Sequence, residues 1–417
     1  MSRLIASVVL LLGGLAAHGC GPSVHRNPVP HDLVYQAQVP GLEEYRFIGD
    51  DGIVRDMRAT LARLYEARSS VVSMDEWKKP IRILSISGGG QNGAYGAGLL
   101  AGWSESGTRP TFQFVTGIST GALTAPMAFL GPDYDPILKR VYTLYDTADF
   151  IEKKGLLGAL TSDSMMRVKG LKSVINEFVN DDVVDAIAVE HRKGRRLWVG
   201  TTNLDANEPT FWCISGIASS DVDDRAALIR KILLASASIP VAFPPVYFEV
   251  EADGTTYDEM HVDGGVANQV FVYPLTVDIQ GLLEQVIGQP LDDPKVYVIR
   301  NSRILPHWEA TKPKILPIAA RAMSSLISTQ GVGDLYQIYL GCLRDDMDFN
   351  LARIPDSFDK TYDQDFDPVY MTALYELGYE HAKNGYAWEK LPPDYVLDAN
   401  QLKQLQERER RDGSMSR

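Results

Sequence analysis

The sequence contains little of what marks a metalloprotein or a disulfide-bonded protein. Its three cysteines lie at positions 20, 213 and 342, too few and too scattered for a disulfide framework or a zinc cluster. The seven histidines show no His-Glu-x-x-His pattern and no other metal-ligand spacing. We therefore expect no catalytic metal and no cofactor.

An excess of positive charge is absent too. The 417 residues include 41 Lys and Arg against 54 Asp and Glu, a formal net charge of -13, which argues against nucleic acid as a partner. Internal repeats and low-complexity tracts are also missing. The composition, 45% hydrophobic and 23% charged, is that of a globular protein. Strand patterns alternate with helix patterns, which indicates one α/β domain of three layers rather than several domains.

A long apolar run occurs at the N-terminus, from Leu4 to Ala17. It is too short to span a bilayer comfortably but suits the core of a signal peptide, predicted over residues 1–19. Gly19 before Cys20 resembles a bacterial lipoprotein cleavage box, in which Cys20 becomes the lipidated first residue. An ordinary secretory signal cut near Gly19 is the alternative. Both interpretations predict export, the first to a lipid anchor on a membrane facing the periplasm and the second to secretion.

The remaining chain divides by composition. Residues 20–45 contain four prolines and predict an extended tether. Residues 46–395 predict the α/β domain, and residues 396–417 a charged tail. The apolar segment Gly155–Leu160 is a candidate cap over a site, with core packing as the simpler explanation. Two helical stretches are expected near residues 315–328 and 335–342.

The most informative segment is Phe112–Leu123, which predicts a buried strand, a sharp turn and an Ala- and Leu-rich helix. The turn Gly117-Ile118-Ser119-Thr120-Gly121 has the G-x-S-x-G form of a nucleophile elbow. Gly117 and Gly121 leave room at a bend where side chains would clash across strand and helix. Ser119 would lie at the N-terminal end of the helix, where negative charge is favoured. The sequence therefore predicts Ser119 as a nucleophile.

A glycine loop, Gly88-Gly89-Gly90-Gln91-Asn92-Gly93, follows the strand predicted over residues 81–87. Such a loop presents backbone N–H groups to an anion, which could be a phosphate or a reaction oxyanion. Its G-x-G-x-x-G spacing also satisfies the dinucleotide-binding fingerprint. That fold, however, requires an acidic residue at the end of the second strand, where this chain has Thr116–Ser119. Dinucleotide binding is therefore the weaker interpretation.

A nucleophilic serine needs a base, and the usual base is a histidine oriented by an acid. His261 is the one histidine in a motif-like segment, and along a strand it would point the same way as Asp263. A Ser–His–Asp triad is thus one interpretation, although in α/β-hydrolases the acid precedes the histidine by a long gap. The turn Asp263-Gly264-Gly265 could also be a simple tight turn with a side-chain cap.

Taken together, three motifs resemble, in order, the signatures of the patatin-like phospholipases. They are the glycine loop at 88–93, the elbow at 117–121 and the acidic turn at 263–265. The segments 202–205 and 235–245 also look like that family. The resemblance implies a three-layer α/β/α fold with a mainly parallel central sheet. It also implies hydrolysis of fatty-acyl esters of lipids at a membrane surface.

The resemblance further implies a Ser–Asp dyad without histidine, in which Ser119 is the nucleophile and Asp263 the base. Partial burial would have to raise the basicity of the Asp263 carboxylate. The family usually carries Arg or Lys where this chain has Asn92, whose amide donates hydrogen bonds without a charge. The alternative function is an inactive or weakly active exported lipid-binding or envelope protein on the same fold. The resemblance implies an oxyanion hole formed by Gly88, Gly89, Gly90, Asn92 and Gly93. It also implies that Gly264 and Gly265 complete the acidic turn after Asp263.

Overall fold

The computed structural model describes residues 26–49, 80–150, 152–153, 166–167, 169–273, 278, 280–281, 293–305, 308, 310–362, 364–397 and 403. The predicted signal peptide, Cys20, the segment Gly155–Leu160 and most of the charged tail lie outside these residues. Among the described helices, none combines the length and the apolar character needed to cross a membrane.

Nine strands form one sheet in the order β1-β7-β6-β3-β2-β10-β11, with the hairpin β8-β9 attached through β9 to β6. Five neighbouring strands, β6, β3, β2, β10 and β11, are parallel, whereas β7 and β1 are antiparallel. The predicted mainly parallel sheet is thereby confirmed. The bounds are β1 Arg46–Ile48, β2 Arg82–Ile86, β3 Phe114–Ile118, β6 Arg196–Asn203, β7 Glu208–Cys213, β8 Val246–Ala252, β9 Thr255–Asp263, β10 Lys295–Arg300 and β11 Asp348–Arg353.

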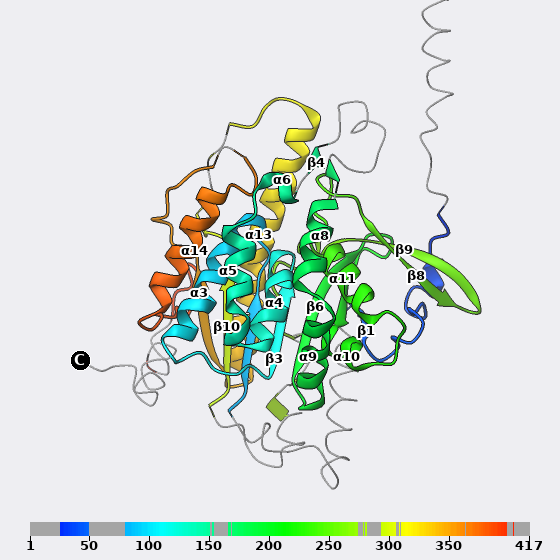
Figure 1. Ribbon diagram of the computed structural model, residues 1–417, viewed down its shortest axis with the longest axis horizontal. Helices are drawn as coiled ribbons and strands as arrows, with labels where there is room; N and C mark the ends of the chain where they lie inside the picture. The colour runs from blue at the N-terminus through cyan, green and yellow to red at the C-terminus, as the bar shows by residue number, and fades with distance from the viewer. Residues whose placement is uncertain are drawn as a thin grey trace, which may run out of the picture.

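Helices cover both faces of the sheet (Figure 1). A second, small sheet pairs β4 (Glu152–Lys153) with β5 (Met166–Arg167). The helices are α3 Gly93–Glu105, α4 Thr120–Leu130, α5 Asp135–Thr143, α6 Thr147–Phe150, α8 Lys169–Phe178, α9 Asp181–Arg192, α10 Ile214–Ser219, α11 Arg225–Ser236, α13 Ile315–Arg344 and α14 Pro368–Ala382. The short 3-10 turns are η1 His31–Leu33, η3 Gly90–Asn92, η4 Pro132–Tyr134 and η5 Gly264–Val266.

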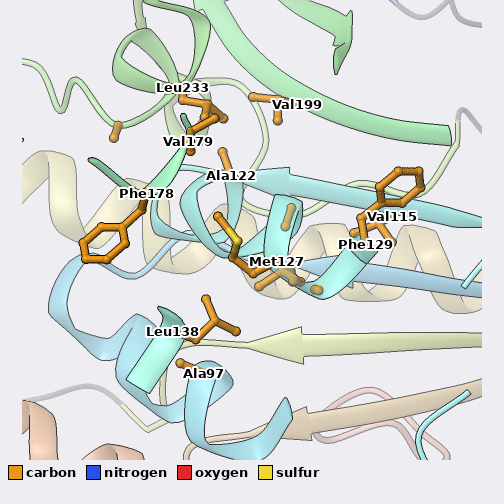
Figure 2. Close-up of a cluster of buried hydrophobic side chains, with 14 of the residues drawn as sticks. Ala97, Val115, Ala122, Met127, Phe129, Leu138, Phe178, Val179, Val199 and Leu233 are labelled. Carbon is orange, nitrogen blue, oxygen red and sulfur yellow. The ribbon is translucent and has the colours of Figure 1, made fainter. Parts of the chain in front are cut away.

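Alternation along the strands builds hydrophobic cores on both faces of the sheet. In β2, Leu84 joins the larger core beneath α3, α4 and α14, whereas Ile83 joins a second core beneath α13. This is the period of two that a sheet buried on both faces requires. Figure 2 shows part of the larger core, where Ala122 and Met127 of α4 lie among Val115 of β3 and side chains of neighbouring helices. The result is the predicted three-layer arrangement.

The two helical stretches expected near 315–328 and 335–342 are one continuous helix, α13. Gly331 and Gly333 interrupt the apolar pattern between them, and this made the sequence look like two elements. At Gly331 an added Cβ would lie 3.0 Å from atoms of Arg300 and Gln269. Close packing therefore explains this glycine, which does not end the helix.

Residues 26–45, predicted as part of a tether, are packed onto the domain. The amide of Gln38 donates to the carbonyl of Glu251 in β8 at 3.0 Å, and the carbonyl of Gln38 accepts from the amide of Glu251 at 2.8 Å. Ala37 and Leu42 are fully buried. Since these contacts continue into β1 at the sheet edge, the described part of this segment belongs to the folded domain. Its prolines favour extended backbone, which here lies against the β8-β9 hairpin.

A buried ion pair joins this N-terminal segment to β9. Arg46 and Glu259 are each 1% exposed and pair directly through the guanidinium and carboxylate groups. The guanidinium of Arg46 also donates to the carbonyl of Ala37 at 2.8 Å. A charge in such surroundings is tolerated only while its partner is present.

Replacing Arg46 with Ala should destabilise the protein by about 3–5 kcal/mol, because Glu259 would remain buried without its cationic partner. Urea unfolding followed by circular dichroism measures this change. Arg140→Ala is the matched control, since Arg140 pairs with Glu177 at an exposed site and its loss should cost under about 1 kcal/mol. Equal effects of the two substitutions would contradict the assignment of Arg46 as a structural anchor.

Candidate active site

Two strand ends meet at one edge of β6. Strand β3 runs parallel to β6 and pairs Ile118 with Gly200, whereas β9 runs antiparallel and pairs Asp263 with Thr201. Because Gly200 and Thr201 are consecutive, the C-terminal ends of β3 and β9 point toward each other along the same edge. Ser119, the residue after β3, consequently contacts Asp263, and the distance from Ser119 Oγ to Asp263 Oδ2 is 2.6 Å.

The turn at Ser119 has the strained backbone of a nucleophile elbow. Ser119 has φ 55° and ψ −124°, a region that non-glycine residues seldom adopt and that is concentrated at functional sites. A Cβ at Gly117 would lie 2.5 Å from the carbonyl oxygen of Gly121, and one at Gly121 would lie 2.2 Å from that of Ile86. Only glycine at both positions allows α4 to begin directly after β3.

Ser236, at the end of α11, fixes the elbow from the other side. Its Oγ accepts a hydrogen bond from the amide of Ser119 at 3.0 Å and donates one to the carbonyl of Gly200 at 2.7 Å. Sequence reasoning missed this role. The only signal in the sequence was that Ser236 follows an apolar stretch at the end of a helix, within the segment 235–245. A hydroxyl buried at such a position requires a specific hydrogen-bond partner.

Asp263 is a buried carboxylate without a cationic partner among the described side chains in contact with it. It is 3% exposed; its Oδ2 accepts from Ser119 and its Oδ1 from the amide of Gly265 at 2.7 Å. Burial raises the pKa of Asp263 to about 7, although the hydrogen bonds from Ser119 and Gly265 act in the opposite direction. A carboxyl group with this pKa can accept a proton near neutral pH.

The glycine loop lies beside Ser119, and its amides have different roles. The amide of Gly88 donates to the carbonyl of Gln269 at 3.1 Å, and the amide of Gly93 donates to carbonyls of its own turn. Among the described residues, the amides of Gly89 and Gly90 have no acceptor. A Cβ at Gly90 would meet nothing within 4 Å, so this glycine faces open space. Among the five residues predicted for the oxyanion hole, the backbone amides of Gly88, Asn92 and Gly93 are thus engaged within the fold.

Asn92 makes a structural contact. Its Oδ1 accepts a hydrogen bond from the hydroxyl of Tyr370 in α14 at 2.9 Å. The neighbouring Gln91 is also tied to α14, because its Oε1 accepts from the amide of Asp367 at 3.2 Å. These contacts connect the glycine loop to α14 and give Asn92 a positioning role within the loop.

An apolar pocket opens next to Ser119. Its volume is about 480 Å³, including the space open to solvent at its mouth. The wall joins segments that are far apart in the sequence, and its polar groups belong mainly to Ser119, Thr120 and Tyr142. The lining residues are Gly90, Ser119, Thr120, Leu123, Val141, Tyr142, Phe150, Leu171, Ala237, Ile239, Phe243, Phe366 and Met371.

His261 does not contact Ser119 and is held in a separate buried cluster. Its Nδ1 lies 2.9 Å from Thr201 Oγ1 and its Nε2 lies 3.0 Å from Glu259 Oε2. Since a carboxylate only accepts hydrogen bonds, Nε2 carries the proton and Nδ1 accepts from Thr201. Both ring nitrogens are therefore engaged away from Ser119. This geometry counts against the Ser–His–Asp triad.

The described residues include no group of three or more His, Cys, Asp or Glu side chains placed to hold a metal ion. Cys213 and Cys342 are buried, and each lies in an apolar cluster on the same face of the sheet.

The segment 84–276 matches the family model described as patatin-like phospholipase. This segment contains the glycine loop, the elbow and the acidic turn, and it covers a little less than half of the chain. The chain is therefore similar to this family over that segment and has the patatin fold. No curated protein matches the sequence.

Solved structures that match the chain include VipD from Legionella pneumophila, with 12% sequence identity and a TM-score of 0.39. That match covers 73% of this chain and 66% of VipD. Another is human GIVD cytosolic phospholipase A2, with 11% identity and a TM-score of 0.30, covering 76% of this chain and 53% of the human protein. The chain thus spans about two thirds and about half of these two proteins, respectively.

The raised pKa of Asp263 predicts a pH-dependent stability. The pKa of Asp263 in the folded protein, about 7, exceeds the ordinary value of 3.8. The contribution of this group to the free energy of unfolding is therefore fully present below about pH 4 and is lost as pH rises through about 7. The substitution Asp263→Asn removes this loss. The stability of the variant relative to wild type should therefore increase between pH 5 and pH 8, as measured by urea unfolding. A difference that does not change with pH would contradict the raised pKa.

Proposed function

We propose that this protein is a serine acyl hydrolase that cleaves fatty-acyl esters of lipids through a Ser119–Asp263 dyad. The single observation that carries the proposal is the 2.6 Å contact between Ser119 Oγ and Asp263 Oδ2 at a strained elbow, beside an apolar pocket. A serine with a purely structural role would need none of three features found together here. They are a positive φ at the serine, a buried carboxylate without a cationic partner, and an open apolar cavity.

In the first step, Ser119 Oγ attacks the ester carbonyl carbon while its proton passes to Asp263 Oδ2. The ionised form of Asp263 predominates above about pH 7, so the base is available near neutral pH. No further group is needed to orient it, because the amide of Gly265 fixes the other carboxylate oxygen. The leaving alcohol then takes the proton from Asp263, and an acyl–Ser119 ester remains.

The negative charge that develops on the carbonyl oxygen would be stabilised by the amides of Gly89 and Gly90. The support is that Gly90 and Ser119 both line the pocket. The N-terminus of α4, directly after Ser119, adds a favourable dipole. One oxyanion-hole donor typically contributes about 3–4 kcal/mol to stabilisation of the transition state.

The second step hydrolyses the acyl-enzyme. Water attacks the acyl carbon, Asp263 accepts its proton, and the proton returns to Ser119 as the fatty acid departs. The apolar wall formed by Leu123, Phe150, Leu171, Phe243 and Met371 suits the hydrocarbon chain of an acyl group. Burial of each methylene there would stabilise the bound substrate by about 0.8 kcal/mol.

The substitution Ser119→Ala should abolish covalent labelling by a fluorophosphonate and reduce esterase activity by at least about a thousandfold, since the nucleophile itself is removed. Mass spectrometry of the labelled protein identifies the modified residue, and hydrolysis of a p-nitrophenyl ester measures activity.

The matched control is Ser220→Ala, which removes a half-buried hydroxyl outside the site and should leave labelling unchanged. Persistent activity in folded Ser119→Ala protein would refute the proposed nucleophile. Folded wild-type protein that does not react with the probe would instead favour the alternative, a lipid-binding protein on this fold.

We also propose that the protein is exported and anchored through a lipid on Cys20. The support is the N-terminal pattern alone, an apolar run over Leu4–Ala17 followed by Gly19 and Cys20. An anchor of this kind would hold the pocket near a lipid surface.

Expression in a bacterium should yield a mature chain that begins at Cys20 and carries a diacylglycerol modification, detected by intact-mass analysis. The substitution Cys20→Ser should remove that added mass. A wild-type chain cut near residue 20 without added mass would support simple secretion and contradict lipidation.

A further inference from the structure

The N-terminal half of α13 presents an apolar stripe to solvent. Ile315, Ile318, Ala322 and Leu326 recur at i, i+3, i+7 and i+11, which places them on one helix face. Ile315 is 86% exposed, Ile318 53% and Leu326 72%, and Ala322 is also exposed. An amphipathic helix of a globular protein normally turns such a face toward the core. Here the apolar face points outward.

Charge and aromatic residues around the stripe identify the kind of partner it fits. Residues 310–333 contain three basic residues and no Asp or Glu, although the whole chain has a net charge of -13. Lys312 and Lys314 are exposed directly before the helix. Trp308, 84% exposed, and Leu305, 63% exposed, precede them. Exposed tryptophan, basic residues and an apolar helix face characterise helices that lie in the interface of an anionic membrane.

This stripe is connected to the candidate active site through the middle of α13. The carboxylate of Asp334 accepts hydrogen bonds from the amides of Gln269, at 2.7 Å, and Val270, at 3.2 Å. The backbone carbonyl of Gln269 in turn accepts a hydrogen bond from the amide of Gly88 in the glycine loop. Leu326 precedes Asp334 by eight residues, about 12 Å along a helix. The stripe therefore ends at Leu326, about 12 Å along the helix from Asp334, and extends away from it to Ile315, about 28 Å from Asp334.

The same relation is visible in the overall arrangement. In Figure 1 the N-terminal end of α13 projects from the domain at the end of the molecule where α6 and β4 lie. Helix α6 supplies Phe150 to the pocket wall. A membrane that contacts the stripe would therefore lie at the same end of the molecule as Phe150 in the pocket wall.

We propose that the N-terminal half of α13, together with Leu305, Trp308, Lys312 and Lys314, is a docking surface for an anionic lipid bilayer. We call it the α13 surface. The apolar stripe enters the boundary between headgroups and acyl chains, and the basic residues contact the anionic headgroups. This inference rests on the proposed function, because it explains how a lipid substrate reaches the pocket from a bilayer.

The test uses full-length Ser119→Ala protein, so that binding is measured without hydrolysis. The probe is quenching of Trp308 fluorescence by vesicles of brominated phosphatidylcholine and phosphatidylglycerol. The signal is isolated as the difference from a Trp308→Phe variant, because the sequence has six tryptophans. This readout reports insertion of the α13 surface even where the N-terminus also binds membranes. We expect strong quenching, which weakens at least severalfold without phosphatidylglycerol or in 1 M salt.

The combined substitution of Ile315, Ile318 and Leu326 by Ser should reduce this quenching at least tenfold. The matched control replaces three other exposed apolar residues, Tyr35, Val189 and Val396, by Ser and should behave as the parent protein. In the background with Ser119 intact, the α13 triple variant should hydrolyse a soluble short-chain ester at the wild-type rate and lose activity on vesicles.

Undiminished Trp308 quenching in the α13 triple variant would overturn the proposal. A dimer that the same substitutions dissociate, without Trp308 quenching by vesicles, would also overturn it and assign the stripe to a second copy of the chain. Quenching that depends on the stripe, in a wild-type protein without esterase activity, would support the docking surface while refuting the proposed hydrolysis.

Discussion

The candidate site depends on one constraint, the end-to-end meeting of β3 and β9 along a single edge of β6. Consecutive residues of β6, Gly200 and Thr201, face the ends of the two strands, so Ser119 and the Asp263 carboxylate are placed by backbone hydrogen bonds. This crowding explains nearby small residues. A Cβ at Gly264 would lie 2.4 Å from the carbonyl oxygen of Gly200, the same oxygen that accepts from Ser236. A shift of one residue in either pairing would separate the two groups.

The pocket remains apolar because its buried hydroxyl groups satisfy one another. Tyr142 contacts Thr120 Oγ1 at 2.5 Å and Thr124 Oγ1 at 3.0 Å. Burial raises the pKa of Tyr142, although its bonds to the two threonines act in the opposite direction, so its phenol stays neutral. These hydroxyls therefore need no partner from a bound molecule, and they leave the rest of the pocket wall apolar.

Sequence alone predicted the parts of the fold that local chemistry determines. The G-x-S-x-G turn, the glycine loop after β2 and the parallel β2-α3-β3 unit all follow from short-range steric rules, and the fold class was confirmed. Contacts between distant segments were not predictable in this way. Strand β1 has only three residues and is defined by pairing with β7, and the attachment of residues 26–45 depends on β8. The role of Ser236 depends on where α11 ends relative to Ser119, which no local pattern encodes. For Asn92, the residue type was visible but its partner, Tyr370, lies 278 positions away.

Strand β9 buries two carboxylates four residues apart and shifts their pKa values in opposite directions. Burial acts to raise the pKa of both. At Glu259 the hydrogen bond from His261 and the charge of Arg46 outweigh burial, and the pKa is lowered. At Asp263 the partners are a hydroxyl and a backbone amide, and the pKa rises to about 7. The first carboxylate is thereby fixed as a structural anion, whereas the second can exchange a proton near neutral pH. The difference lies in the side chains around each group, since strand and depth are the same. The histidine that the sequence offered as a base therefore contributes to the fold by keeping Glu259 ionised.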